Sequence, residues 1–581
     1  MHRYTRFFIG GFLILGLMPI TGAEEIRDYY AEPGLNPFKE TLNQSFHEHI
    51  DPFSGSLQHQ YTDIHLPGNG GLDIKVQRVY TSLQEQRPPR GVTGVGWTMH
   101  FGRIVTADAH KDKLCNQYGW AVSTADNPSI EFPDGGRELL VLDALHGNYL
   151  ISKRGFRARC VTEGLEVTSP EGTVYTMNQF AYTNNEPSWH TTAIRDRHGN
   201  SLEVQYKWSG VYLCIDRIRS SDGREITYEY LDEGSVGVRL GAITANGQTW
   251  RYHYSAIAGA PEGYYQLTEV ERPDGLRWRY AYYPSQSSAL DAGRYSLQSV
   301  TYPYGAHIGY TYQKVDFDRA NQDYDLWTTA VATKTLSGAS VQAGEWRYEF
   351  QPYDPNYSGL DKTTVTTPNG TEVYYHYGYS YSGYSFGILW TVGLLFQHDT
   401  YDPNGTLLES VTHGWSKRRI SDENFWQGRL ARDIGTYAAL PSSTTTVRRN
   451  GGNRTAYSNY DSYGNAHTRT ETSNLAGDPD RVTSLTYYVD PGRWILHQVE
   501  DETIARIGTI DRSFDERGDL ITENKYGVLT TYTYTPEGDL ASATDARGNT
   551  VRYSDYLRGI AEREEHPEGV VIQRSVNLTG T

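Results

Sequence analysis

Pairs of adjacent carboxylates are the residues of this chain whose types could support acid–base chemistry. Asp501 lies beside Glu502, and Glu564 lies beside Glu565. Hydrolysis of a glycosidic bond needs two carboxylates about 5 to 10 Å apart on one side of a site, whereas neighbours on a strand point to opposite faces of the sheet. Most other acidic residues precede a turn glycine, where an aspartate bonds the backbone of its own turn. We therefore expect no catalytic residue and no enzyme, and glycan hydrolysis stays a third hypothesis.

Two groups of side chains resemble metal ligands without completing a set. Four histidines lie close together in the sequence, at His47, His49, His59 and His65. The first two would share one face of a strand, but zinc needs a third or fourth ligand of known position. Segments 196–200 and 545–549 both have the pattern Asp-x-x-Gly-Asn, which lacks the ligand spacing of an EF-hand calcium loop. We expect solvated histidines, ordinary turns, no metal and no cofactor.

The three cysteines set a narrow limit on covalent cross-links. Cys115, Cys160 and Cys214 can form at most one disulfide and leave one thiol, or all three can be buried as small apolar side chains. No pair has the spacing of a metal-binding cysteine motif. The core must therefore supply the stability of the fold, and the disulfide state stays open.

The elements that would position these side chains follow a register that repeats behind six glycines. The glycines are Gly199, Gly223, Gly247, Gly275, Gly305 and Gly370. The third residue after each glycine is apolar, and after the last five glycines the fifth and seventh residues are both tyrosine. These tyrosines are Tyr228, Tyr230, Tyr252, Tyr254, Tyr280, Tyr282, Tyr310, Tyr312, Tyr375 and Tyr377. Mostly polar residues lie between them, and alternation with period two predicts a strand with one buried face.

A second apolar position precedes the turn. A β-branched residue lies five residues before most of these glycines, at Ile194, Ile218, Val270, Val300 and Val365. A strand, a turn of the Asp-Gly, Asn-Gly or Tyr-Gly type and a second strand make a β-hairpin. We therefore predict an all-β chain built as an array of similar hairpins. The tyrosines could stack on sugar rings, but their regular register favours packing against neighbouring hairpins.

Length, composition and charge fit a repeat array. The chain has 581 residues, and the first five glycines follow one another at intervals of 24, 24, 28 and 30 residues. One hairpin per unit fits these intervals, and stacked units bury a core that none could bury alone. The formal net charge is −17 at pH 7, and an acidic chain without basic patches is not built to bind nucleic acid.

The first 23 residues have the pattern of a secretory signal peptide. Arg3 and Arg6 precede an apolar stretch from residue 7 to residue 17, and small residues lead to a cleavage site after Ala23. The alternative is an uncleaved anchor, but this stretch is shorter than the roughly 20 residues that span a bilayer. We expect export to the periplasm, the cell surface or the medium, and no transmembrane span once the signal has been removed.

Composition and register divide the mature chain further. Residues 24–190 form an entry region of β-strands and turns, and residues 191–315 form the tandem hairpins. An irregular β segment or insert covers residues 316–360, and less regular repeats fill residues 361–581, which end within a unit.

The repeated unit resembles the YD repeat, Tyr/Phe-Asp-x-x-Gly-x-apolar, of the RHS (rearrangement hot spot) family of bacterial proteins. Units of this kind occupy residues 460–466 and 514–520. The segments Asp51-Pro-Phe-Ser-Gly, Leu66-Pro-Gly-Asn-Gly-Gly-Leu and Gly94-Val-Gly-Trp resemble the entry region that precedes such arrays. Relatives in this family include the teneurins and the shell subunit of insecticidal toxin complexes. The resemblance implies a long β-sheet that spirals into a hollow shell or part of one.

In full-length toxins of this family, the shell encloses a variable C-terminal toxin. A self-cleaving motif of the Asp-Pro-Leu/Ile-Gly-Leu type releases that toxin inside the shell. This sequence has no such motif, since Asp402-Pro403 and Asp490-Pro491 are ordinary turn signals. We therefore expect the N-terminal shell portion of a longer protein, a truncated gene product, or a stand-alone piece of shell.

The resemblance implies a structural role. The chain would be an exported shell or scaffold segment that encloses or delivers a polypeptide toxin in competition between cells. Its partner would be a toxin cargo or a C-terminal continuation. The alternative is a cell-surface adhesin or carbohydrate-binding protein that binds a cell-surface glycan through the tyrosine-rich β-surface. Neither role involves nucleic acid.

Overall fold

Strands are almost the only regular secondary structure in the described part of the chain. The computed structural model describes residues 48–82, 91–106, 128–143, 149–161, 164–183, 186–284, 293–317, 327–339, 341–354, 359–378, 390–421 and 436–577. Within these ranges the helical residues are those of the 3-10 turn η2 (Asn69–Gly71) and residues 390–391, which are also 3-10, and no helix there is long and apolar enough to cross a membrane. The all-β prediction is confirmed. Ala23, His47 and Cys115 lie outside the described residues.

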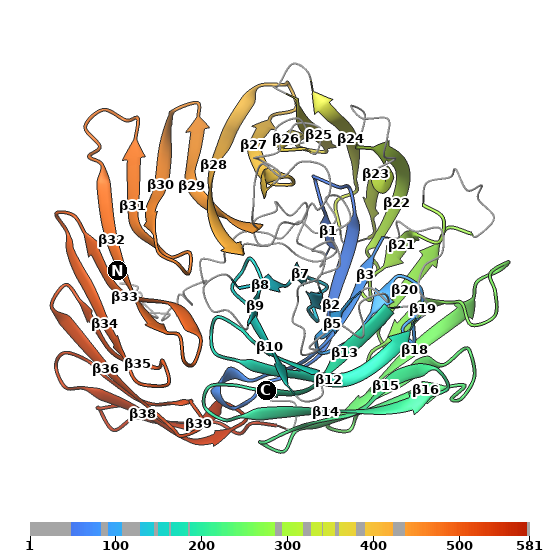
Figure 1. Ribbon diagram of the computed structural model, residues 1–581, viewed down its shortest axis with the longest axis horizontal. Coiled ribbons are helices and arrows are strands. Elements are labelled where there is room, and N and C mark those ends of the chain that lie inside the picture. Colours follow the sequence, from blue (N-terminus) through green and yellow to red (C-terminus); the bar gives the residue numbers. More distant parts are fainter. Residues whose placement is uncertain are drawn as a thin grey trace, which may run out of the picture.

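The first strands form a separate antiparallel sheet in the order β1-β2-β3-β4. They are β1 (Glu48–Ile50), β2 (Leu57–Leu66), β3 (Ile74–Thr81) and β4 (Trp97–Thr98). Apolar residues of β2 and β3 pair across the strands, as Ile64 does with Val76 and Leu66 with Ile74. Figure 1 shows β1, β2 and β3 inside the curve of the remaining strands.

The remaining 36 strands form one long antiparallel sheet. The strands up to β22 are β5 (Arg103–Val105), β6 (Ser129–Glu131), β7 (Arg137–Leu139), β8 (Val141–Leu142), β9 (Leu150–Ile151), β10 (Arg157–Val161), β11 (Gly164–Thr168), β12 (Val174–Thr183), β13 (Glu186–Arg195), β14 (Ser201–Ser209), β15 (Tyr212–Ser220), β16 (Glu225–Leu231), β17 (Arg239–Ala245), β18 (Gln248–Ala256), β19 (Tyr265–Glu271), β20 (Arg277–Tyr282), β21 (Leu297–Thr301) and β22 (His307–Asp316). The later strands are β23 (Trp327–Ser337), β24 (Gly344–Asp354), β25 (Leu360–Thr367), β26 (Gly370–His376), β27 (Leu395–Tyr401), β28 (Leu407–Ser421), β29 (Thr436–Arg448), β30 (Gly451–Tyr460), β31 (Ala466–Ser473), β32 (Arg481–Asp490), β33 (Ile495–Ile504), β34 (Gly508–Phe514), β35 (Leu520–Lys525), β36 (Val528–Tyr534), β37 (Leu540–Thr544), β38 (Thr550–Leu557), β39 (Ile560–Glu565) and β40 (Val571–Gln573).

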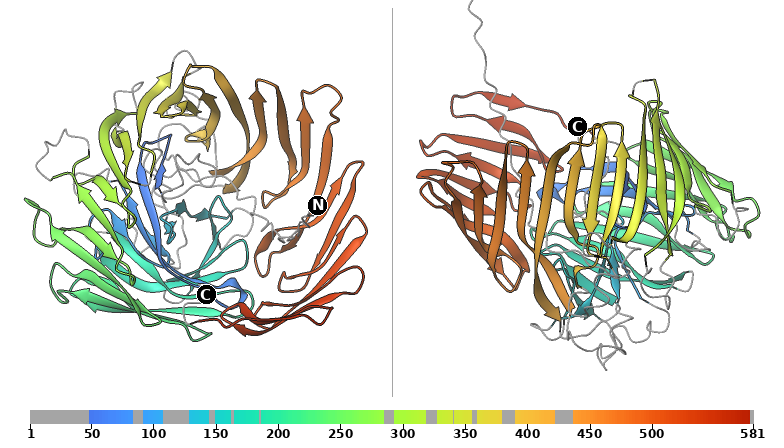
Figure 2. Two further views of the ribbon diagram at one scale, coloured as in Figure 1. Left: turned by 180° about the vertical axis from the view of Figure 1, so that it is seen from behind. Right: turned by 90° about the horizontal axis from the view of Figure 1, so that it is seen from above.

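Strand pairing in the long sheet follows the order of the chain, so each hairpin pairs with the next. The short strands β5 to β7 join this sheet where Ile104 of β5 pairs with Trp189 of β13. The last described pairing is that of β39 with β40, and no described pairing closes the sheet into a barrel. The sheet curves so far that β38 and β39 lie beside β12 and β14 (Figure 1). Figure 2 shows this single curved layer from behind and from above.

The predicted hairpin register is confirmed at four turns. The cross-strand partners are Ile194 with Leu202, Ile218 with Ile226, Val270 with Trp278, and Val300 with Ile308. Each pair joins the residue five before a turn glycine to the residue three after it. Both strands therefore place apolar side chains on the same inner face.

The register differs at the sixth glycine. Val365 pairs with Glu372 rather than with Val373, because Gly370 is already part of β26 and pairs with Thr367. Only two residues form this turn, whereas the turn around Gly199 has five, closed by the bond from the Asp196 amide to the Asn200 carbonyl (3.1 Å). Loop length fixes register in a hairpin, so the same glycine spacing gives a different partner here.

A β-bulge precedes the second tyrosine of each early unit. The strand register shifts before Tyr230, Tyr254, Tyr282 and Tyr312. A bulge interrupts the ladder of backbone hydrogen bonds, and a tyrosine hydroxyl reaches the backbone there. Tyr282 donates to the Leu267 carbonyl and Tyr312 to the Leu297 carbonyl, both at 2.7 Å. The seventh position thus buries a ring and satisfies a carbonyl of the other strand of the same hairpin.

The main core lies between the four-stranded sheet and the inner face of the early hairpins. It includes Ile64 and Tyr80 from the first sheet and Ile226, Val270 and Ile308 from the hairpins, all buried.

The two described cysteines differ in oxidation state, which agrees with the prediction of at most one disulfide. Cys160 is disulfide-bonded. Cys214 is a free, buried thiol, and burial raises its pKa to about 12.

Candidate functional site

The four-stranded sheet carries a buried ion pair against the tyrosine face of the hairpins. Arg78 of β3 makes two bonds of 3.0 Å to the carboxylate of Asp63 in β2, and both side chains are fully buried. Tyr252 donates to Asp63 Oδ2 (2.9 Å), and Tyr280 accepts from Arg78 Nη1 (2.6 Å). A bidentate pair of this kind is strong and directional. It fixes the position of the first sheet on the repeated tyrosines.

A second buried ion pair joins β1 to β23. Lys334 Nζ lies 2.6 Å from Glu48 Oε2, and both side chains are fully buried. Burial raises the pKa of Glu48 and lowers that of Lys334, while the ion pair opposes both shifts. Tyr310 donates to Glu48 Oε1 (2.5 Å), and His59 Nε2 lies 2.8 Å from the same hydroxyl. The contacts are satisfied if His59 donates from Nε2 to Tyr310.

The register places the predicted tyrosines in two rows and one separate cluster. The buried row comprises Tyr228, Tyr252, Tyr280 and Tyr310. The partly buried row beside it comprises Tyr230, Tyr254, Tyr282 and Tyr312. Tyr375 and Tyr377 pack in a different cluster with Leu360 and Val373. The tyrosines of the early units therefore form the wall that holds the first sheet.

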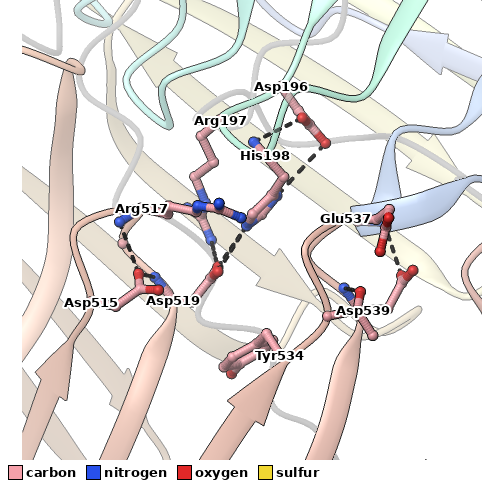
Figure 3. A network of polar contacts seen from close by, with 12 residues as sticks. Asp196, Arg197, His198, Asp515, Arg517, Asp519, Tyr534, Glu537 and Asp539 are labelled. Carbon is pink, nitrogen blue, oxygen red and sulfur yellow. Dashed lines mark hydrogen bonds and ion pairs between the residues drawn. The ribbon is translucent and has the colours of Figure 1, made fainter. Parts of the chain in front are cut away.

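A second site lies where the two ends of the long sheet meet. Turns of an antiparallel sheet alternate between its two edges. We call rim A the edge with the turns after odd-numbered strands, and rim B the edge with the turns after even-numbered strands. Rim A of β9 to β16 contacts rim B of β32 to β39, and we call this contact the coil seam. Figure 3 shows its central polar network.

His198, in the turn between β13 and β14, is the centre of the coil seam. Its Nε2 lies 2.9 Å from Asp519 Oδ2, and its Nδ1 lies 3.7 Å from Asp196 Oδ2. The Asp196 and Asp519 carboxylates raise the pKa of His198 to about 9, against the effect of burial. Burial alone would raise the pKa of Asp519, but His198 and Arg197 hold it below its usual value. The seam therefore holds an imidazolium between two carboxylates at neutral pH.

The glycine-rich turn around η2 joins both ends of the long sheet. Arg224 of the early hairpins donates to the Leu66 and Leu72 carbonyls (2.8 and 2.9 Å). On the other side, the Gly70 amide donates to Asp539 Oδ1 (2.9 Å), and the Gly559 amide donates to Asn69 Oδ1 (3.0 Å). A β-carbon on Gly559 would lie 2.3 Å from the carbonyl oxygen of residue 68. The turn can approach so closely because these positions lack side chains.

Trp494 extends the seam beyond its polar network. Its side chain is fully buried, its indole donates to the Gly155 carbonyl (2.8 Å), and the Arg157 guanidinium lies 4.1 Å from its ring centre. Beside it the Leu496 amide donates to the Pro170 carbonyl (3.0 Å). Both ends of the sheet are thus joined by apolar, cationic and backbone contacts.

In each of the two carboxylate pairs considered as acid–base groups, the two side chains bind different partners. Asp501 accepts a bond from Thr486 (2.9 Å), whereas Glu502 pairs with Arg469 (2.9 Å). In the second pair, residue 564 binds Arg574 and residue 565 binds Arg563, both at 2.5 Å. Neighbouring acids thus point to different partners, as expected for a strand.

Two of the histidines considered as metal ligands have partners within the protein. His59 Nε2 lies 2.8 Å from the Tyr310 hydroxyl, and His65 Nε2 lies 2.7 Å from Asp73. The aspartates at positions 196 and 545 accept bonds from the amides of their own turns, as a turn residue does.

One group among the described residues has metal-compatible spacing, namely His253, Glu269 and Glu271. Arg277 already binds both of its carboxylates, at 2.7 and 3.0 Å.

Sequence reasoning missed the charged residues that hold the structure together. Glu48, His198 and Asp519 have no local signal, because Lys334 is 286 residues from Glu48 and Asp519 is 321 residues from His198. Asp63 and Arg78 pair within one hairpin, but the tyrosines that complete their contacts lie 189 and 202 residues away. The turns at 196–200 and 68–71 were recognised only as turns. The run Gly68-Asn69-Gly70-Gly71 is a sequence signal for this contact, because glycine permits another backbone to approach closely.

The comparison with solved structures shows a shared fold in one case. A family model described as "Domain of unknown function (DUF6531)" matches residues 47–132. No curated protein is significantly similar in sequence. The crystal structure of TcdB2-TccC3 aligns with 94% of this chain at 7% identity and a TM-score of 0.54. This chain covers 57% of that chain, and the likeness shows a shared fold alone.

Two further solved structures have TM-scores too low to support an argument. The Photorhabdus luminescens Tc holotoxin pore gives 0.20 at 10% identity, with 90% of this chain and 33% of that chain covered. The N-terminal domain of effector protein SpvB from Salmonella typhimurium gives 0.17 at 11% identity, with 67% and 99% covered. The fold that the chain shares with TcdB2-TccC3 is a coiled antiparallel sheet of hairpins.

Proposed function

We propose that this chain is an exported structural protein, a shell or scaffold segment that encloses or delivers a polypeptide toxin in competition between cells. It acts without a catalytic site of its own. One observation carries the proposal: the open sheet curves until its two ends meet in the coil seam. A wall of this kind needs no cofactor chemistry, only closure and stability. The fold of TcdB2-TccC3, a toxin-complex structure, supports the same role.

The buried charges support a container rather than a binding surface. Arg78 and Glu48 anchor the first sheet inside the curve through partners on β2, β18, β20, β22 and β23. The hairpins around this sheet expose the opposite face to solvent. An antiparallel sheet with one packed and one solvated face is suited to serve as such a wall.

The glycan-binding alternative depends on exposure of the repeated tyrosines, and the early units bury the tyrosine at the fifth position after the glycine. Tyr252 and Tyr310 are each 2% exposed, and their hydroxyls bond buried carboxylates. A sugar ring could not stack on either. We therefore do not carry this alternative further.

Protease protection in the native protein tests the proposal. The mature chain is purified from the cell that produces it and digested with a broad-specificity protease, then unfolded in urea for mass spectrometry. We expect a large resistant fragment that includes residues 48–577 and a protected polypeptide from outside this sequence. Many small fragments of the chain, with nothing protected, would contradict a closed wall and a cargo alike.

A matched variant separates enclosure from simple adhesion. Asp519→Ala removes the carboxylate that binds Arg197 and His198 across the seam, whereas Asp545→Ala removes the same residue type from an exposed turn. We expect the first variant alone to expose the cargo to protease. Equal protection in both variants would show that the seam does not enclose it.

A further inference from the structure

The buried contact between Lys334 and Glu48 holds an amine and a carboxyl group together inside the core. Lys334 Nζ lies 2.6 Å from Glu48 Oε2, and neither side chain is exposed to solvent. The two residues lie 286 positions apart along the chain, on β23 of the long sheet and on β1 of the four-stranded sheet. An amine and a carboxyl group in this arrangement are the two reactants of an amide bond.

Strand register fixes the two reactants from opposite sides of the core. In the long sheet, Lys334 of β23 pairs with Tyr310 of β22 on one side and with Trp346 of β24 on the other. In the first sheet, Glu48 of β1 pairs with His59 of β2. The two cross-strand pairs Glu48–His59 and Tyr310–Lys334 therefore meet directly. Side chains on strands are held more precisely than side chains on loops.

The surroundings of the two reactants are dry. His59 and Lys334 are each 0% exposed, and the ring centre of Trp346 lies 4.6 Å from Lys334 Nζ. Burial raises the pKa of Glu48 and lowers that of Lys334, which favours the uncharged amine, the form that attacks a carboxyl group. An ion pair taken out of water carries a large desolvation cost, and a neutral amide does not.

We propose that Lys334 and Glu48 condense without another enzyme into an isopeptide bond that covalently joins β1 to β23. Lys334 Nζ attacks Glu48 Cδ and forms the C–N bond. Glu48 Oε2 takes two of the three ammonium protons and leaves as water as the C–O bond breaks, and the amide nitrogen keeps the third proton. No oxidant or co-reactant is needed. The reaction occurs once per chain, and it does not depend on whether the coil encloses a cargo.

The hydroxyl of Tyr310 is placed to assist the reaction. It donates to Glu48 Oε1 (2.5 Å), the oxygen that becomes the amide carbonyl. Negative charge develops on Oε1 as Nζ attacks, and a fixed donor at that oxygen lowers the barrier. His59 Nε2 lies 2.8 Å from the same hydroxyl, and a hydrogen bond donated from His59 strengthens the one that Tyr310 donates. Held reactants also avoid the entropy cost of a bimolecular encounter.

The other buried ion pair of the first sheet cannot react in this way. Arg78 and Asp63 are equally buried, but a guanidinium stays protonated and offers no amine nucleophile. Tyr280 belongs to the same buried tyrosine row as Tyr310, and its hydroxyl contacts Arg78 (2.6 Å) instead of Glu48. Tyr280 is therefore a matched control for Tyr310.

Mass spectrometry of the folded, purified chain tests the proposal. The chain is unfolded and digested, and its peptides are sequenced by fragmentation. We expect a branched peptide that joins the segment around residue 48 to the segment around residue 334, lighter by one water than the two linear peptides together. Lys334→Arg keeps the positive charge but removes the amine, so this variant is expected to give the linear peptides alone.

A time course after cell-free synthesis, quenched in acid, measures the rate of bond formation. Tyr310→Phe is expected to slow the bond about 100-fold, the usual effect of removing one donor to a developing oxyanion, whereas Tyr280→Phe leaves the rate unchanged. Circular dichroism verifies the fold of each variant. Equal rates in the two variants would overturn the role of Tyr310. Linear peptides alone from the native chain, or a missing water that maps to other residues, would overturn the isopeptide bond itself.

Discussion

At the scale of single residues, buried charges decide where the first sheet lies. Arg78 and Asp63 are both fully buried, and their remaining polar atoms meet tyrosine hydroxyls of two different hairpins. Two charges taken out of water gain little net stability as a pair. The loss of one partner, by contrast, leaves the other charge buried and unpaired. Such a pair specifies position more than it stabilises the fold.

We predict that Arg78→Ala destabilises the unit that contains the four-stranded sheet by about 3–5 kcal/mol, because Asp63 is left without its cation. Urea unfolding followed by tryptophan fluorescence measures the change, since Trp97 packs against Arg78 (4.8 Å). Arg219→Ala is the control, because Arg219 and Glu225 form an exposed pair and exposed pairs contribute little. Equal effects of the two substitutions would show that burial of the pair is unimportant.

At the scale of the elements, hairpin turns act as contact points as well as reversals. The turns at 515–519 and 535–539 are ordinary tight turns by sequence, yet both are covered by the turn at 196–200. Gly538 has a φ of +91° and packs against the His198 ring, and Gly548 has a φ of +83° with open space around it. Two turns of one type thus differ in the space available for a side chain at the glycine, because His198 lies opposite only the first.

We predict that Gly538→Ala loosens the coil seam and that Gly548→Ala does not. Both substitutions place a β-carbon at positive φ, at a similar cost of about 1–2 kcal/mol, but only the first also displaces His198. Hydrogen exchange of the amides of residues 198–200 reports the seam and is expected to accelerate in Gly538→Ala alone. Unchanged exchange in that variant would mean that the seam tolerates the added atom.

At the scale of the whole molecule, closure depends on contacts between turns, with one isolated β-bridge between Glu171 and Ile495 in place of a continuous strand pairing. The seam is therefore separable from the sheet: it can open while the hairpins stay paired. His198 is the titratable cation at its centre, and the carboxylates of Asp196 and Asp519 surround it. Arg197 also pairs with Asp519 (2.9 Å). Closure of the coil is thus linked to pH.

We predict that the seam is most stable from about pH 4 to 6.5. The pKa of His198 is raised to about 9, so its contribution is complete below the unfolded value and is lost as the pH rises toward 9. The pKa values of Asp196 and Asp519 are lowered, so their contribution is lost as the pH falls below their unfolded value. Protease sensitivity across pH measures this, and His198→Gln should remove the alkaline limb and weaken the acid limb, because His198 is the main group that lowers the pKa of both carboxylates.

Local pattern was sufficient for the strands and their pairing. Period-two alternation and turn glycines predicted the all-β fold, and Ile218 and Ile226 face each other as the register required. These features depend on residues within one hairpin, where sequence distance and spatial distance are similar. Val365 shows the limit, because one difference in turn length moved its partner by one residue.

The sequence by itself determined the hairpin array, the inward rows of tyrosine and the tight turns, because local backbone geometry and side-chain alternation specify them. The tertiary structure decided which turns meet and where the buried charges find partners. His198 and Asp519 lie 321 residues apart along the chain, and no local pattern encodes their contact. It arises only when the accumulated curvature of many hairpins brings the end of the sheet back to its beginning.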